Sequence, residues 1–147
     1  MSNLKEIISE LQRIIEEDAD VKAFCNEKYG KDIHVEAGEF RFSAIPIKNI
    51  PVAIVSDGFD ESEKRRFLFS EHEANLVITC GILQKNVRES QEELIQLKDH
   101  IKSAVKKDPL LSGLASYSTV TKSRRLKAIT NPLNFMELTV YVNFKAV

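Results

Sequence analysis

The sequence of 147 residues predicts an α+β fold, in which a mostly antiparallel sheet of about five strands carries two main helices packed on one face. Three observations predict it: two segments have apolar residues at helical spacing, most other apolar segments alternate with polar residues, and most connections are short. The length and the composition, 43% hydrophobic and 29% charged, indicate a single domain over residues 1–147 that needs neither disulfides nor metal to fold.

The first element is an amphipathic helix predicted from about residue 2 to 17. Its apolar stripe faces the core and consists of Leu4, Ile7, Ile8, Leu11, Ile14 and Ile15. A short turn is expected through 21–25. Acidic residues crowd the end of the helix, where the macrodipole disfavours negative charge. We therefore expect no stabilising role for them and interpret them as a solvated helix end or as a contact surface for a basic partner: Glu16, Glu17, Asp18 and Asp20.

Strands are expected after Gly30. Alternation predicts strands around 33–35 and 40–44, and the apolar run 52–55 is typical of a strand covered on both faces. Residues 56–73 are expected to form a long charged loop, which contains a first basic cluster of Lys64, Arg65 and Arg66. Alternation then predicts a further strand over 74–83.

The second helix is predicted to begin at Ser90, which forms a capping box with Glu93, and to stop at Asp108-Pro109. Its apolar stripe consists of Leu94, Ile95, Leu97, Ile101, Ala104 and Val105. Strands over 115–122 and 136–146 close the chain, and the long segment 123–135 between them is expected to be a hairpin arm. A second basic cluster lies on this arm and the end of the preceding strand: Lys122, Arg124, Arg125 and Lys127.

The net charge of −1 conceals a division along the chain. Residues 1–95 carry 12 basic and 19 acidic side chains, a net charge of −7, whereas residues 96–147 carry 9 basic and 3 acidic ones, a net charge of +6. Opposite charge on separate segments is one simple way to give a subunit two complementary surfaces. The acidic residues at the end of the first helix and the second basic cluster are our candidates for such surfaces. Both basic clusters, including Lys64, Arg65 and Arg66, could contact a protein partner, with solvated loop charge or loose contact with nucleic acid as the alternatives.

No catalytic, cofactor-binding or metal-binding site is expected. The five glycines form no phosphate-binding loop, and the three histidines are far apart, whereas zinc ligands are closely spaced in the sequence. Cys25 and Cys80 show no CxxC spacing and are expected to be small buried apolar groups in a reduced intracellular chain. No apolar stretch approaches the roughly 20 residues of a membrane span, so no membrane partner is expected.

Several segments together give the chain a resemblance to a known family. These are the N-terminal helix with its acidic end, "FRFSAIPIKNIPVAIVSDG", "ANLVITCGIL" leading into "SQEELIQLKDHIKSAV", the basic "TKSRRL" and the closing "MELTVYVNF". In this layout, which covers almost the whole chain, the sequence resembles the tail terminator, or tail completion, proteins of long-tailed bacteriophages and prophages.

The resemblance implies a structural protein without catalytic residues or cofactor, located in the virion tail and, during assembly, in the host cytoplasm. Its partners would be other copies of itself in a hexameric ring, the tail tube protein, whose polymerisation the ring ends, and the head–tail connector protein. DNA passing through the lumen of the ring would come close to the basic loops without specific recognition.

Three alternatives remain open from the sequence. The first is a head-completion or connector protein of the same assembly, or a component of a contractile injection system. The second is a small intracellular enzyme whose site is assembled from dispersed residues such as His34, His72 and Asp57, which would require a deep apolar pocket with converging polar groups. The third is a monomeric adaptor domain with one sizeable apolar patch.

Overall fold

The computed structural model of the chain describes residues 3–39, 45–66, 68–126 and 132–146. Within these ranges it contains three helices, a short 3-10 turn and five strands. In chain order they are α1 (Leu4–Glu17), α2 (Ala19–Tyr29), β1 (His34–Ala37), η2 (Ile47–Asn49), β2 (Val52–Arg65), β3 (Ser70–Leu83), α3 (Val87–Lys106), β4 (Tyr117–Arg125) and β5 (Leu133–Ala146). The α+β class is therefore confirmed, with one helix more than the two main helices predicted.

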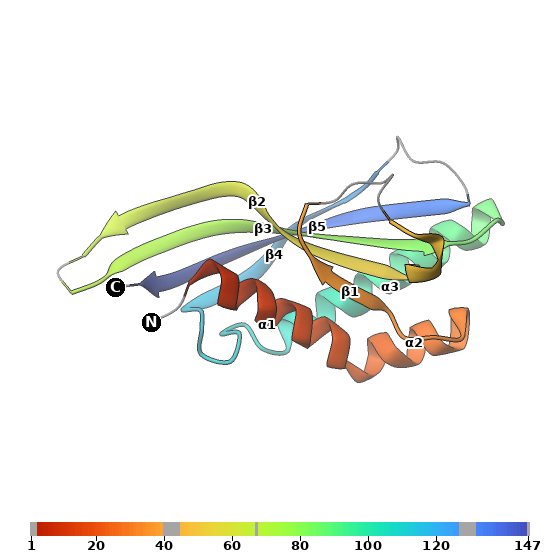
Figure 1. Cartoon of the computed structure of the whole chain (residues 1–147), viewed down its shortest axis with the longest axis horizontal. Helices are drawn as coiled ribbons and strands as arrows, with labels where there is room; N and C mark the ends of the chain where they lie inside the picture. Colours follow the sequence, from red (N-terminus) through yellow and green to blue (C-terminus); the bar gives the residue numbers. More distant parts are fainter. Residues whose placement is uncertain (1–2, 40–44, 67, 127–131, 147) are drawn as a thin grey trace.

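The five strands form one sheet in the order β1-β2-β3-β5-β4. β1 runs parallel to β2, and every other pair is antiparallel, which confirms a mostly antiparallel sheet. The three helices lie together on one face (Figure 1). No helix among the described residues has the length and hydropathy of a membrane span.

The helices cover the sheet with the apolar stripes that the sequence predicts. Ile7, Leu11 and Ile15 of α1 are fully buried, and the other three stripe residues pack partly buried against the same core. The stripe of α3 is buried except for Ile95, which is exposed. The even-numbered residues of β3 and β5 face the helices and complete the core: Ala74, Leu76, Ile78, Cys80, Ile82, Met136, Leu138, Val140, Val142 and Phe144.

Two helix boundaries differ from the prediction. α3 is capped by Asn86, whose side chain accepts a hydrogen bond from the backbone of Glu89, so the expected cap at Ser90 is wrong. α2 is a helix of 11 residues rather than a short turn. It is stable at this length because Asp18 caps its start, Gly30 ends it at φ 70°, and Val21, Phe24 and Cys25 are buried.

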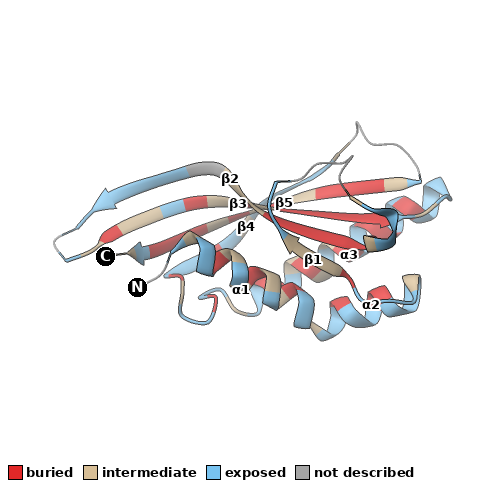
Figure 2. Cartoon of the chain, viewed as in Figure 1, coloured by how far each residue is buried: buried red, intermediate tan, exposed pale blue. Residues whose placement is uncertain are grey.

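The predicted loop over 56–73 is wrong. β2 continues to Arg65 and β3 already begins at Ser70, so the charged segment forms a long β-hairpin, interrupted by a register shift between Ser56 and Asp60. This hairpin projects beyond the helices (Figure 1), and its β2 strand is mostly exposed (Figure 2). Charged residues are tolerated in β2 because residues 61–65 are exposed on both faces of the strand, whereas most of the paired residues of β3 are buried or partly buried.

The basic segment over 123–135 forms a hairpin only in part. β4 extends to Arg125 and β5 begins at Leu133, so residues at both ends of the predicted arm belong to the sheet. Residues 127–131, which include Lys127, lie outside the described residues, as does the strand predicted over 40–44.

A second, smaller core lies on the face of the sheet opposite the helices. It consists of Ile50, Val52, Ile54 and Phe135, with three partly buried residues around them. Gly81 lies directly across from Phe135 in the register of β3 and β5. A Cβ atom built on Gly81 would approach the Phe135 ring to 2.2 Å, so the ring occupies the space that any other residue would need.

We therefore predict that Gly81→Ala lowers the free energy of unfolding by about 1–3 kcal/mol, because the added methyl group forces the Phe135 ring to move. Urea denaturation of the single variants Gly81→Ala and Phe135→Leu and of the double variant measures the coupling. The double variant should lose less stability than the sum of the single losses. If the losses of the two single variants added exactly in the double variant, the contact between the Phe135 ring and residue 81 would not be the cause of the lost stability.

Candidate functional site

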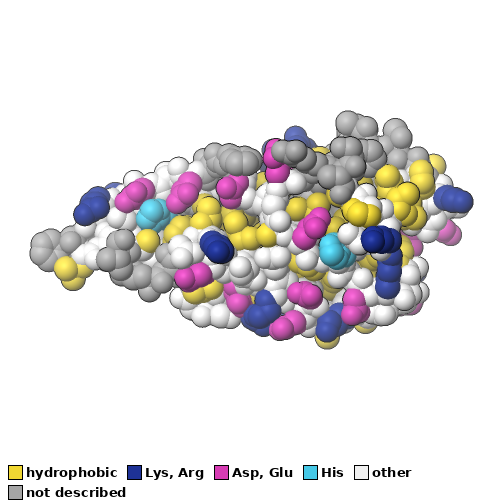
Figure 3. All heavy atoms as spheres, viewed as in Figure 1, with side chains coloured by type: hydrophobic (Ala, Val, Ile, Leu, Met, Phe, Trp, Pro, Cys, Tyr) yellow, Lys and Arg dark blue, Asp and Glu magenta, His cyan; other side chains and the backbone are white. Residues whose placement is uncertain are grey.

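The candidate site of this chain is a set of charged surfaces rather than a catalytic cleft. Figure 3 shows one face of the molecule, with hydrophobic side chains over the middle of the sheet and near η2, and charged side chains along α1 and α2. The three groups of charged residues predicted from the sequence lie in different places. The acidic residues lie between α1 and α2, the first basic cluster lies at the tip of the β2–β3 hairpin, and the second lies along β4.

The acidic residues have a structural role that the sequence did not indicate. Asp18 lies at the start of α2 as well as at the end of α1, and its carboxylate accepts hydrogen bonds from the backbone of Asp20 and Val21. Negative charge is favourable at a helix start, so the expectation that the acidic residues have no stabilising role is wrong for Asp18. Lys107, just after α3, donates to both Asp18 at 2.8 Å and Asp20 at 3.3 Å.

These contacts set the ionisation of Asp18. Burial alone would raise its pKa, since its side chain is only 6% exposed, but the hydrogen bonds from Lys107, Val21 and Asp20 outweigh burial and lower the pKa below its usual value. The same contacts raise the pKa of the Lys107 ammonium group. Asp18 therefore links α1 and α2, which belong to the acidic half of the chain, to Lys107 in the basic half.

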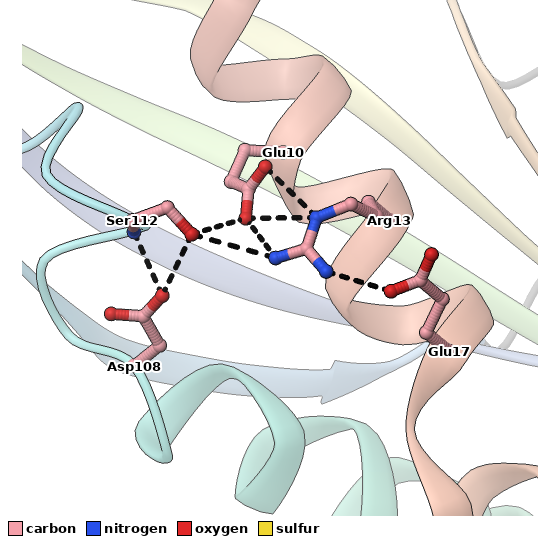
Figure 4. A network of polar contacts seen from close by, with 5 residues as sticks. All are labelled: Glu10, Arg13, Glu17, Asp108 and Ser112. Atoms are coloured by element: carbon pink, nitrogen blue, oxygen red, sulfur yellow. Dashed lines mark hydrogen bonds and ion pairs between the residues drawn. The ribbon is translucent and has the colours of Figure 1, made fainter.

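A second network holds α1 against the loop after α3 (Figure 4). Arg13 binds Glu10 and, at 2.7 Å, Glu17, while the Ser112 hydroxyl donates to Glu10 at 2.7 Å. The backbone N–H of Ser112 donates to Asp108 at 2.7 Å. The hydrogen bond from Arg13 outweighs the effect of burial and lowers the pKa of Glu10. Glu17 is thus already neutralised within the chain, and Glu16 is the acidic residue of this group without a partner among the described residues.

The basic residues divide in the same way into paired and unpaired side chains. Arg66 binds Glu71 at 3.0 Å, and Arg124 binds Glu137 at 2.6 Å. Arg125 donates to the side chain of Asn134 at 2.9 Å. Among the described residues of the two basic clusters, three exposed cations have no hydrogen bond or ion pair: Lys64, Arg65 and Lys122.

The residues considered for an enzyme do not converge. His34 lies on β1 opposite Val52, whereas His72 lies on the projecting hairpin opposite Glu63, so the two histidines stand at different ends of β2. Asp57 lies between them, beside a notch of about 170 Å³ that also contacts Ile8 and Ala37. The described residues contain no group of three or more potential ligands arranged for a metal ion.

Both cysteines are buried, as predicted. Burial raises the pKa of each thiol to about 12, so neither forms a reactive thiolate near neutral pH. Their role is therefore that of small apolar groups in the core.

Comparisons with known proteins show a similarity of fold. No protein-family model matches the sequence, and no curated protein matches it. Among solved structures, a chain of the "Virion of native gene transfer agent (GTA) particle" is similar over 95% of this chain and 94% of its own length, with a TM-score of 0.56 and 9% identity. At this identity the similarity shows a shared fold across almost the whole of both chains.

The Asp18 contacts give a prediction about stability. Asp18→Ala should lower the free energy of unfolding by about 1 kcal/mol at neutral pH, because α2 loses its cap. The folded-state pKa of Asp18 is lowered, so its contribution is present above the unfolded-state pKa of about 3.9 and is lost as the pH falls through the folded-state pKa. Denaturant titrations of both proteins from neutral pH to acid should therefore converge.

The matched control is Glu16→Ala, which removes an exposed carboxylate without a described partner and should change stability by less than about 0.5 kcal/mol. Equal losses in the two variants, or a difference between Asp18→Ala and the unaltered protein that does not depend on pH, would contradict the proposed role of Asp18.

Proposed function

We propose that this chain is a structural protein of a phage-like virion, and more specifically the tail terminator, which forms a ring on the head-proximal end of the tail tube. The fold shared with a chain of the gene transfer agent virion over almost the full length of both proteins is the observation that carries the proposal. It agrees with the whole-chain resemblance of the sequence to tail terminators. The dispersed positions of His34, His72 and Asp57 give no support to the enzyme alternative.

The proposed partners are other copies of this chain, the tail tube protein and the head–tail connector protein. A head-to-tail ring needs two different surfaces on each subunit, which meet when the rotation closes. The first basic cluster, at the hairpin tip, and the second, along β4, lie at opposite ends of the sheet, because Arg65 aligns with the end of β5 and Arg125 with its start. These clusters and the acidic residues Glu16 and Asp20 are our candidates for contacts between subunits or with the tube and connector.

A strain that lacks this protein tests the proposal. We expect electron microscopy of its particles to show tail tubes of irregular length that are not joined to heads, because nothing ends polymerisation or provides the joining surface. Expression of the unaltered protein in the same strain should restore joined tails of uniform length, with the protein at the head end of the tube when it is labelled. Normal joined particles in the strain without the protein would contradict the proposed function.

A further inference from the structure

Besides the outer side of the short strand β1, two long strand edges of the sheet have no partner among the described residues. β1 pairs with β2 only over Val52–Val55, so the projecting part of β2 is open on that side. At the other end of the strand order, β4 pairs with β5, and no described strand pairs with its outer side. Soluble proteins usually cover or interrupt long open edges because such edges pair readily with other strands. Two long open edges on one chain therefore need an explanation.

The directions of the strands fit pairing between identical copies. Neighbours alternate in direction through β2, β3, β5 and β4, so β2 and β4 run in opposite directions within one subunit. In a ring, a rotation about the ring axis places a second copy beside the first, and strands that run roughly along this axis keep their direction. The β2 of the second copy then runs antiparallel to the β4 that it meets. A head-to-tail ring thus brings two different edges together in the antiparallel pattern.

The free backbone groups lie at matching positions. Leu126 donates its N–H to Phe135 across the β4–β5 pair, and because antiparallel bonds alternate, Ser123 and Arg125 direct their N–H and C=O groups outward. In the same way, Arg66 donates to Phe69, which leaves the backbone groups of Glu61 and Glu63 directed outward from β2.

The side chains at these outward positions lie on the same face of the sheet. Ser123 and Arg125 align with Leu138 and Met136, and Glu61 aligns with Ala74, all of which face the helices. Pairing through these positions therefore keeps the helices of both copies on one side of a continuous sheet. A pairing that placed the helices on opposite sides would not match the free backbone groups.

Charge favours one alignment of the two edges. β4 contains three cations and no acidic residue, whereas the outward positions of the projecting part of β2 carry the exposed carboxylates Glu61, which also contacts His72, and Glu63, followed by Arg65 nearer the tip. With Arg125 opposite Glu61, Ser123 meets Glu63. The β4 bulge at Thr121 then brings Tyr117, 48% exposed, beside Leu68 at the hairpin tip, 76% exposed. The two edges thus match in direction, hydrogen bonding and exposed apolar side chains; in charge, the pair of Arg125 and Glu61 is favourable, whereas Lys122 lies opposite Lys64.

We propose that in the ring β4 of each subunit pairs antiparallel with the projecting part of β2 of the next subunit, with Arg125 beside Glu61 and Tyr117 beside Leu68. The inference rests on the proposed function for the existence of a ring and adds the surfaces that form it. The occupant of each open edge is a second copy of this chain.

Charge variants test the alignment in the strain that lacks the protein, with the fraction of joined particles as the readout. Arg125→Glu should lower this fraction on the order of tenfold, because two carboxylates then face each other at every contact in the ring. Adding Glu61→Arg to Arg125→Glu should restore it. Circular dichroism and the Tm of each purified variant establish that it is folded.

Lys122→Glu is the matched control, since it makes the same charge change on the same strand. In the proposed alignment Lys122 lies opposite Lys64, so this variant should join particles at least as well as the unaltered protein. An equal loss in Lys122→Glu and Arg125→Glu, or no recovery in the double variant, would overturn the alignment and leave only a general need for positive charge on β4.

Cross-linking tests the pairing itself. The double variant Glu63→Cys with Ser123→Cys adds two exposed thiols, while Cys25 and Cys80 are buried. Treatment of purified particles with a short bis-maleimide should give a ladder of covalent oligomers of this chain for the double variant and none for either single variant. Particles that are joined but give no ladder would overturn the edge pairing without touching the proposed function. Absence of the protein from joined particles would instead overturn the proposed function.

Discussion

The fold depends on β3, which pairs with β5 along its whole length and with β2 over most of it. One half of this strand has its even-numbered side chains buried under the helices, and the other half projects beyond them (Figures 1 and 2). The sheet is therefore longer than the helical layer that stabilises it. The covered half supplies the hydrophobic core, and the projecting half places a regular, hydrogen-bonded surface where another molecule can reach it.

Charge is distributed to suit this arrangement. The acidic and basic halves of the sequence partly neutralise each other inside one subunit, most directly where Lys107 binds Asp18 and Asp20. Glu17 and Arg124 likewise have partners within the chain. Exposed charges without a partner among the described residues lie both on the helices, as at Glu16, and along the open edges of the sheet, as at Lys64 and Lys122. The sequence asymmetry thus contributes to the packing of the helices, and its role in assembly is part of the proposal.

Periodicity predicted the parts of the fold in which one face is buried, namely α1, most of α3 and the closing strand. It failed over 56–73, because the projecting part of β2 is exposed on both faces and has no apolar face that would distinguish it from a loop. It also assigned Asp18 to the end of one helix, since a sequence does not reveal that the next helix starts there. The candidate surfaces were located only as charged segments, because pairing with Lys107 or Glu137 depends on contacts between distant parts of the chain.

We propose that this chain assembles into a ring through its own sheet edges at the head end of a virion tail. Cryo-electron microscopy of intact particles, at a resolution that separates strands, would show this ring. We expect a ring of this chain between tube and connector, with β4 of each subunit beside β2 of the next in one continuous sheet. A ring in which both edges face solvent, or the absence of this chain from the particle, would rule out the proposed assembly.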